Sequence, residues 1–159
     1  MNPAKIQSRT IPIQKRHRRL KLVPADVRAA LRELDRSGFF PCPAGELSLV
    51  FMDDAEIARL HEEFFGDPSP TDVITFEGDP AMNFAGEICV SADHALRYAE
   101  QHGVDFSREL TLYLVHGYLH LAGFDDTGPA DRRRMRAAEK KSLALLESSG
   151  LLPLFHVVT

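Results

Sequence analysis

Residues 107–126 of the chain read SRELTLYLVHGYLHLAGFDD and form its most informative segment. Apolar side chains occupy nearly every side of the helix that we expect over Ser107–Ala122. A helix that is apolar all round is typical of the centre of a protein. Gly123 follows directly, at the place where glycine commonly ends a helix and lets the chain turn back. We therefore expect the other elements to pack around this helix.

Two histidines interrupt this apolar helix at the spacing that a metal ion requires. His116 and His120 are four residues apart, so both imidazoles lie on one helical face, one turn apart. Helices offer two nitrogens to one metal in this way, and a dry imidazole without a partner costs free energy. Asp126 lies far enough beyond His120 to curl back as a third ligand. We predict a metal site of His116, His120 and Asp126.

A site of two histidines and one carboxylate supports a particular chemistry. It leaves one coordination position open, as hydrolytic zinc sites do, and bound zinc lowers the pKa of water to about 7. We interpret His116 as catalytic through the metal, and Asp125 as a catalytic candidate that orients a ligand or the attacking water. A structural turn role for Asp125, and a merely solvated or structural histidine pair, are the alternatives. None of the other histidines is expected to be a ligand, and three are expected in solvent: His17, His102 and His156.

The residue after the first histidine narrows the class of enzyme. Zinc peptidases carry His-Glu-x-x-His, in which the glutamate is the general base. Gly117 occupies that position here, so a peptidase is a weak interpretation and any base must come from elsewhere. Asp72 and Glu87, near expected strand ends, are candidates for a base or for a partner of a ligating histidine. A turn cap for Asp72 and a solvent-facing strand position for Glu87 are the alternatives.

Short strands come early in the chain and helices come late. We expect strands at Arg9–Gln14, Leu47–Met52, Val73–Phe76 and Gly86–Val90, and further helices beginning at Pro24, near Asp53, after Ser91 and near Pro129. This order favours an α+β fold over an alternating parallel sheet. Pro12 places the first strand at a sheet edge. Neither a repeat nor a long linker divides the 159 residues, so we expect one domain over residues 1–159.

Composition bounds the partners and the compartment. The 19 Lys and Arg against 23 Asp and Glu give a net charge of −4, which provides no global attraction for nucleic acid. Basic residues gather in Lys15–Lys21 and Arg132–Lys141, which are either solvated faces or phosphate contacts. Two cysteines, no long apolar run and no signal-peptide-like core in Met1–Arg19 lead us to expect a cytoplasmic protein without a membrane partner.

The motifs of the chain resemble those of one known family. The pattern His-Gly-x-Leu-His-Leu-x-Gly-[aromatic]-Asp at residues 116–125 resembles the signature of the YbeY family of bacterial metal-dependent endoribonucleases and rRNA maturation factors. PTDVITF at residues 70–76 resembles the family's Pro-Thr-Asp-Val-Leu-Ser-Phe element, and GEICVS at residues 86–91 resembles its Gly-Asp-Ile-x-Ile-Ser strand. The resemblance covers roughly residues 45–140, in the family's order.

The resemblance implies more than the spacing of the histidines does. It implies a small mixed sheet of about four strands packed by about five helices, with a single metal in a cleft. It implies one Zn²⁺ per chain and single-stranded RNA as the substrate. It also implies a role in 16S rRNA 3′-end maturation and ribosome quality control, with rRNA and the small ribosomal subunit, but not DNA, as partners. The oligomeric state stays open.

Two positions depart from the family's pattern. The third ligand is usually His in the family, whereas Asp126 stands here; an aspartate oxygen binds zinc well but shifts the preference toward harder ions. The family commonly has an Arg shortly before the Pro-Thr-Asp element, where this chain has Phe65. Since an Arg there would suit a phosphate, two alternatives to an endoribonuclease stay open. They are a non-catalytic ribosome-assembly factor with a structural zinc, and a metallohydrolase of other substrates.

Overall fold

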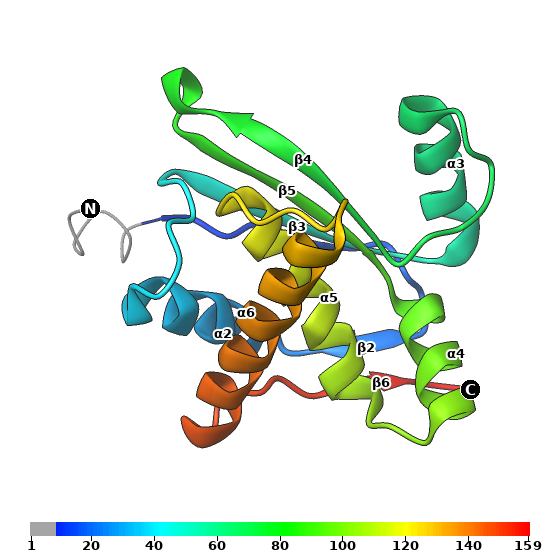
Figure 1. The fold of residues 1–159 in the computed structure, drawn as a ribbon. Helices are drawn as coiled ribbons and strands as arrows, with labels where there is room; N and C mark the ends of the chain where they lie inside the picture. The colour runs from blue at the N-terminus through cyan, green and yellow to red at the C-terminus, as the bar shows by residue number, and fades with distance from the viewer. Residues whose placement is uncertain (1–8) are drawn as a thin grey trace.

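The computed structural model describes residues 9–159 and shows helices packed against a small sheet (Figure 1). Residues 1–8, with the first part of the segment considered for a signal peptide, lie outside the described residues. The strands are β1 (Ile13–Lys15), β2 (Leu20–Leu22), β3 (Glu46–Met52), β4 (Val73–Asp79), β5 (Phe84–Ser91) and β6 (Phe155–Val157). The helices are α2 (Pro24–Ser37), α3 (Asp54–Phe65), α4 (Ala92–His102), α5 (Phe106–Leu121) and α6 (Pro129–Ser148), with a 3₁₀ turn, η1 (Pro80–Met82).

The main sheet has four strands in the order β1-β3-β5-β4. The first three strands run parallel, and β4 pairs antiparallel with β5. The predicted α+β fold with a small mixed sheet is therefore confirmed, and β1 lies at an edge as Pro12 indicated. A second sheet, formed by β2 and β6, was not predicted, because strands of three residues from opposite ends of the chain have no readable alternation.

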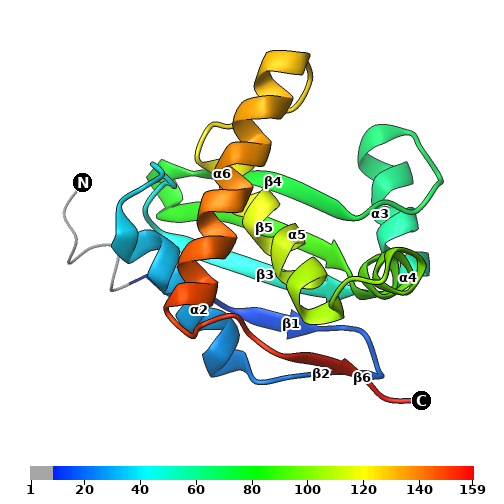
Figure 2. The ribbon, with the colours of Figure 1, turned by 60° about the horizontal axis from the view of Figure 1, so that its bottom comes forward.

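Alternating residues of the strands face two different layers of helices. Leu47, Leu49 and Phe51 of β3 belong to the main core, which helices α2, α5 and α6 complete. Val50 and Met52 point the other way and pack with Ile57 of α3 in a second, smaller cluster. Figure 2 shows α5 and α6 together on one side of the sheet, with α3 standing apart from them. Helix α3 thus covers one face, and the predicted metal site lies on the other.

Helix α5 lies unusually close to the sheet. A Cβ added to Gly117 would lie 2.5 Å from Cγ2 of Ile88 on β5 and 3.2 Å from Oγ1 of Thr75 on β4. Ile88 is completely buried, so it has little freedom to move aside. The glycine therefore permits the approach that brings the histidine face of α5 beside the start of β4.

A second side of α5, one residue further round the helix, is held by a buried polar contact. The hydroxyl of Tyr118 donates a hydrogen bond of 2.9 Å to Oδ1 of Asp35 on α2. The guanidinium of Arg9 lies 2.9 Å from the other oxygen of the same carboxylate. Burial, partly offset by Arg9 and Tyr118, raises the pKa of Asp35. Because a buried carboxylate needs its donors, this contact fixes the orientation of α5 around its axis.

The local signals for helix ends are confirmed where the structure describes them. Asp53 accepts a hydrogen bond from the amide of Glu56, and Ser91 accepts one from the amide of His94. Gly38 and Gly103 end α2 and α4 in the left-handed conformation. Within residues 9–159, no helix combines the length and the apolar character needed to cross a bilayer.

The prediction that His17 is solvated is wrong. Its side chain is buried, and Nε2 lies 2.7 Å from Oδ1 of Asp93 at the start of α4. The same carboxylate accepts a hydrogen bond from the backbone amide of Asp54 at the start of α3. The basic run around His17 hid its role, because the partner lies 76 residues away in the sequence.

Gly117→Ala tests the close approach of α5 to the sheet. The collision with Ile88 costs about 1–3 kcal/mol, which outweighs the gain of up to about 1 kcal/mol in helix propensity. We expect a net loss of about 1–2 kcal/mol of unfolding free energy, measured by denaturant titration. Ile88→Ala makes room at the contact, so it should cost less in the Gly117→Ala protein than in the parent. Equal or greater stability of Gly117→Ala would refute the packing argument.

Candidate metal centre

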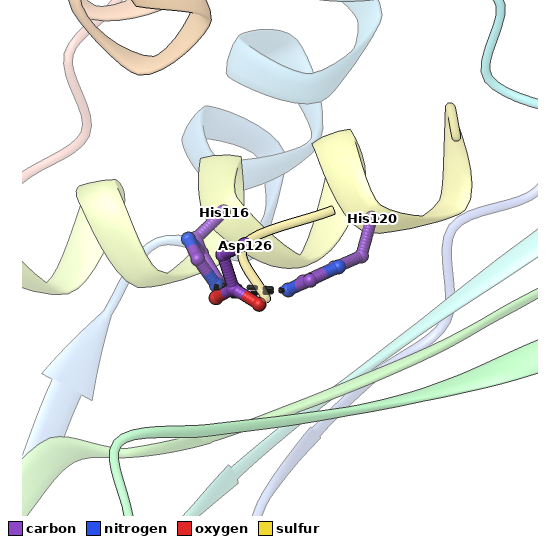
Figure 3. Close-up of side chains that lie close together, drawn as sticks. All are labelled: His116, His120 and Asp126. Carbon is purple, nitrogen blue, oxygen red and sulfur yellow. Dashed lines mark hydrogen bonds and ion pairs between the residues drawn. The ribbon is translucent and has the colours of Figure 1, made fainter. Parts of the chain in front are cut away.

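The structure brings the three predicted ligands together. His116 and His120 come from successive turns of α5, and Asp126 comes from the loop that follows the helix (Figure 3). The two Nε2 atoms lie 3.0 Å apart. Oδ2 of Asp126 lies 3.4 Å from Nε2 of His116 and 3.6 Å from Nε2 of His120. Within the described residues, these three side chains form the group of donors that could hold a metal ion.

The donor triangle fits a tetrahedral ion. Ligand bonds of 2.0–2.1 Å in a tetrahedron place neighbouring donor atoms about 3.3 Å apart. The three separations of 3.0, 3.4 and 3.6 Å scatter around that value. All three side chains are partly exposed, at 24%, 28% and 41%, so a fourth position opens toward solvent. The geometry therefore suits one metal ion with an open coordination site.

Each histidine is oriented by a hydrogen bond from its other ring nitrogen. Nδ1 of His116 lies 2.9 Å from Oε2 of Glu139 on α6, and Nδ1 of His120 lies 3.0 Å from the carbonyl oxygen of Phe124. Both acceptors are oxygens, so the proton sits on Nδ1 and the Nε2 lone pair faces the donor triangle. These contacts select the tautomer that a metal requires.

Charge around the site also acts on His116. Burial lowers the pKa of this imidazole, but the hydrogen bond and negative charge of Glu139, together with Asp126, outweigh burial and raise it. Raising the pKa makes the imidazole a better electron-pair donor, and it strengthens the hold on a cation. Glu139 thus supports the site electrostatically as well as by orientation.

Asp125 closes the turn that carries the third ligand. Its Oδ1 accepts a hydrogen bond of 2.7 Å from the amide of Asp126, and its Oδ2 accepts one from Thr127. These bonds lower the pKa of Asp125, which makes its carboxylate a weak base. Asp125 also lines the cleft in front of the donor triangle. The geometry assigns it the structural turn role, and its predicted catalytic role stays a prediction.

The donor triangle lies in a cleft of about 670 Å³ between α5, the start of β4 and the end of α3. Four carboxylates line it: Asp72, Glu77, Asp125 and Asp126. Two aromatic residues of α3, His61 and Phe65, line the same space. Among the described residues that line the cleft there is no Lys or Arg. The cleft is therefore acidic, which favours a cation at the donor triangle.

Of the two candidate bases, Asp72 lies in the cleft and Glu87 does not. Asp72 lines the cleft, but its Oδ1 accepts a hydrogen bond of 2.8 Å from the amide of Val73, as a cap at the start of β4 does. Glu87 accepts a hydrogen bond from Ser48, on the face of the sheet opposite α5. Its neighbour Ile88 points toward Gly117, so Glu87 points away from the metal cleft. The interpretation of Glu87 as a base or ligand partner is wrong.

The sequence reasoning missed Glu139 and the carbonyl of Phe124. Glu139 lies 23 residues beyond His116, in a helix whose charged residues are mostly basic, so the sequence does not single it out. No local sequence pattern marks Glu139. Only its partial burial in the structure distinguishes it from the exposed basic residues of the same helix. The backbone carbonyl of Phe124 leaves no trace in residue type at all.

Only one of the two basic segments adjoins the cleft. Helix α6 carries Arg132–Lys141 and reaches the site through Glu139. Arg134 lines a smaller cavity that shares Gly123, Phe124 and Asp125 with the main cleft. The Lys15–Lys21 segment begins at β1, which is three strand spacings from β4 in the sheet. The structure therefore favours α6 over the first segment as a surface near the site.

Comparisons with known proteins identify the family of the chain. The sequence profile of the family described as Endoribonuclease YbeY matches residues 9–147. The chain is 38% identical over 151 residues to an Endoribonuclease YbeY of Geobacter sulfurreducens, covering 87% of this chain and 95% of that protein. It is 39% identical over 153 residues to one of Geobacter metallireducens, covering 89% and 99%.

A solved structure supports the fold. The solution structure of TM1509 from Thermotoga maritima matches with a TM-score of 0.63 at 23% identity, covering 88% of this chain and 91% of that one. At this identity the match concerns the fold alone. The profile match covers most of the chain, and the two Geobacter proteins align over nearly their whole length. The chain therefore belongs to the YbeY family.

Proposed function

We propose that the protein is a metal-dependent endoribonuclease that cleaves single-stranded RNA. One observation carries the proposal: three donor atoms within 3.6 Å of one another in an open cleft, on a chain of the YbeY family. The relatives named Endoribonuclease YbeY support the reaction class. The acidic cleft supports a cation as the centre of that reaction.

We assign zinc as the metal, at one ion per chain. Two imidazole nitrogens and one carboxylate oxygen are common zinc donors, and the triangle they form has tetrahedral dimensions. A carboxylate in place of a third histidine lowers the net charge of the site and also admits a harder ion such as Mn²⁺. When bound, the metal supplies Lewis acidity, which helps to deprotonate the attacking hydroxyl and offsets charge on the phosphoryl oxygens.

The chain's own residues prepare this chemistry. His116 and His120 keep their protons on Nδ1, bonded to Glu139 and Phe124, so that both Nε2 lone pairs stay available. Asp125 holds the backbone amide of Asp126 and thereby aims the third ligand. Because these groups are oriented before substrate arrives, little reorganisation is needed during the reaction.

We further propose rRNA as the substrate and the small ribosomal subunit as the partner, with a role in 16S rRNA 3′-end maturation and ribosome quality control in the cytoplasm. Helix α6 supports this proposal, because its basic residues are exposed and one of them, Arg134, lines a smaller cavity that adjoins a cleft without Lys or Arg of its own. Local charge of this kind binds a phosphate backbone despite a net charge of −4.

The alternatives fit the geometry less well. A structural zinc has four protein ligands in a closed site, whereas this one has three and an open position. A peptidase needs a glutamate at position 117, but a Cβ there would already lie 2.5 Å from Cγ2 of the buried Ile88, so a side chain of that size collides with the sheet. The second candidate is therefore a ribosome-assembly factor that binds the metal but does not cleave RNA. An assay of RNA cleavage by the metal-loaded protein separates this candidate from the endoribonuclease.

His116→Ala tests the metal centre and the reaction together. Removing one ligand should lower the bound metal to well below one ion per chain, measured by elemental analysis after dialysis. Cleavage of a single-stranded rRNA fragment should fall about 100-fold or more, because the remaining donors do not hold the ion in place. His156→Ala, an exposed histidine on β6, is the matched control and should change neither quantity. Full metal content with undiminished cleavage in His116→Ala would refute the proposal.

Glu139→Gln tests the support of His116. Glutamine keeps an oxygen acceptor for Nδ1 but removes the negative charge, so the pKa of His116 should fall. We expect metal affinity to drop about 10-fold, measured by competition with a chelator, while the fold is retained. Glu147→Gln, on the same helix but paired with Arg108 away from the site, is the control. Equal affinity of both variants would show that Glu139 contributes nothing through its charge.

A further inference from the structure

Two adjacent phenylalanines end α3, and they have different surroundings. The ring of Phe64 packs edge-to-face on Phe76 of β4, with ring centroids 4.9 Å apart. Phe65 is 61% exposed and lines the metal cleft. Its one aromatic contact in the described structure is with His61, one turn earlier, at 5.7 Å between centroids. Phe64 is nearly as exposed, at 56%, but its ring packs on the sheet, whereas Phe65 lines the metal cleft beside His61.

The segment that carries Phe65 is tied in place. Nδ1 of His61 donates a hydrogen bond of 2.8 Å to the carbonyl oxygen of Ser69 in the loop after the helix. The amide and the hydroxyl of Ser69 both donate to Oδ1 of Asp67. The loop thus connects back to α3 and leads directly into Thr71 and Asp72 of the cleft wall. These bonds hold the His61 ring and the end of α3 in the cleft that contains the donor triangle, so ordering this segment costs little on binding.

The charge of the cleft indicates which part of an RNA chain this face suits. The described lining has four carboxylates and no Lys or Arg, so phosphates away from the metal are repelled there. A nucleobase is uncharged and planar, and it stacks on aromatic side chains whatever its identity. A volume of about 670 Å³ lies in the range of about 300–1,000 Å³ that accommodates ligands of this size. The cleft therefore favours a base against Phe65 and a phosphate at the donor triangle.

We infer that Phe65, backed by His61, is a stacking platform for one unpaired base of an RNA strand whose neighbouring phosphate lies at the metal centre. This inference rests on the proposed function and specifies how that site selects its substrate. A base within a duplex is covered on both faces by its neighbours, so the platform discriminates against paired RNA. Base identity contributes little to such a contact, so the preference is for single strands rather than for a sequence.

The experiment measures binding of a short single-stranded RNA by Phe65→Leu, Phe65→Tyr and Phe64→Leu. Each protein is first shown to melt and to bind metal like the parent, and denaturing gels verify that the RNA stays intact during the measurement. Leucine keeps apolar volume without an aromatic face, tyrosine keeps the face, and Phe64→Leu is the matched control outside the cleft. We expect about 5- to 100-fold weaker binding for Phe65→Leu only.

A second set of RNAs, each with one abasic nucleotide, assigns the contact to a base. At one position the missing base should weaken binding by the parent but not weaken binding by Phe65→Leu further, because the two changes remove the same contact. Additive losses at every position, or equal binding by the Phe65→Leu and Phe64→Leu proteins, would overturn the platform.

Cleavage by the parent, assayed on the same RNA, separates the two proposals. If the RNA is cleaved but the losses from Phe65→Leu and from the abasic positions are additive, the platform is refuted and the proposed nuclease activity is supported. If the losses are non-additive at one position but no divalent metal supports cleavage, the platform is supported and the proposed nuclease activity is refuted.

Discussion

Helix α5 and strand β5 touch where Gly117 meets Ile88, and the site depends on this contact. The helix reaches the sheet only because position 117 carries no side chain, and a Cβ there would lie 2.5 Å from Ile88. The hydrogen bond from Tyr118 to Asp35 of α2 holds the helix on a second side, so its histidine face has one orientation. The glycine that permits this packing also occupies the place where a zinc peptidase needs its general base. One packing constraint thus positions the metal ligands and excludes a neighbouring enzyme class.

Around the ligands, the molecule separates charge of opposite sign. Carboxylates line the cleft and sit behind His116, where they favour a cation and raise the pKa of that histidine. Arginines and lysines occupy the exposed side of α6, and Arg134 among them lines a smaller cavity that adjoins the cleft. The net charge of −4 therefore hides a local separation, because the cleft is acidic and the exposed side of α6 is basic. In the proposed function, a phosphate chain approaches along α6 and a cation stays in the cleft.

Local patterns predicted much of the fold, with limits that have physical reasons. Helix ends at Asp53, Ser91 and the two glycines follow from hydrogen bonds within a few residues, so they can be read directly. The pair of β2 and β6 joins the two ends of the chain in three-residue strands, and no local pattern encodes it. The basic residues around His17 predicted a solvated side chain, yet it is buried and paired with Asp93 of a distant helix. Interactions between distant segments depend on packing that single-sequence patterns do not contain.

The same division holds for the site. The three donors could be predicted from local sequence, because His116 and His120 share a helical face whatever the helix packs against, and a glycine turn returns Asp126 to them. Three other features follow from long-range packing: Glu139 orients His116, Glu87 lies on the face of the sheet away from α5, and Phe65 borders the cleft. Helical periodicity is a local property of the backbone. The neighbours of each side chain are set by how elements far apart in the chain close-pack around α5.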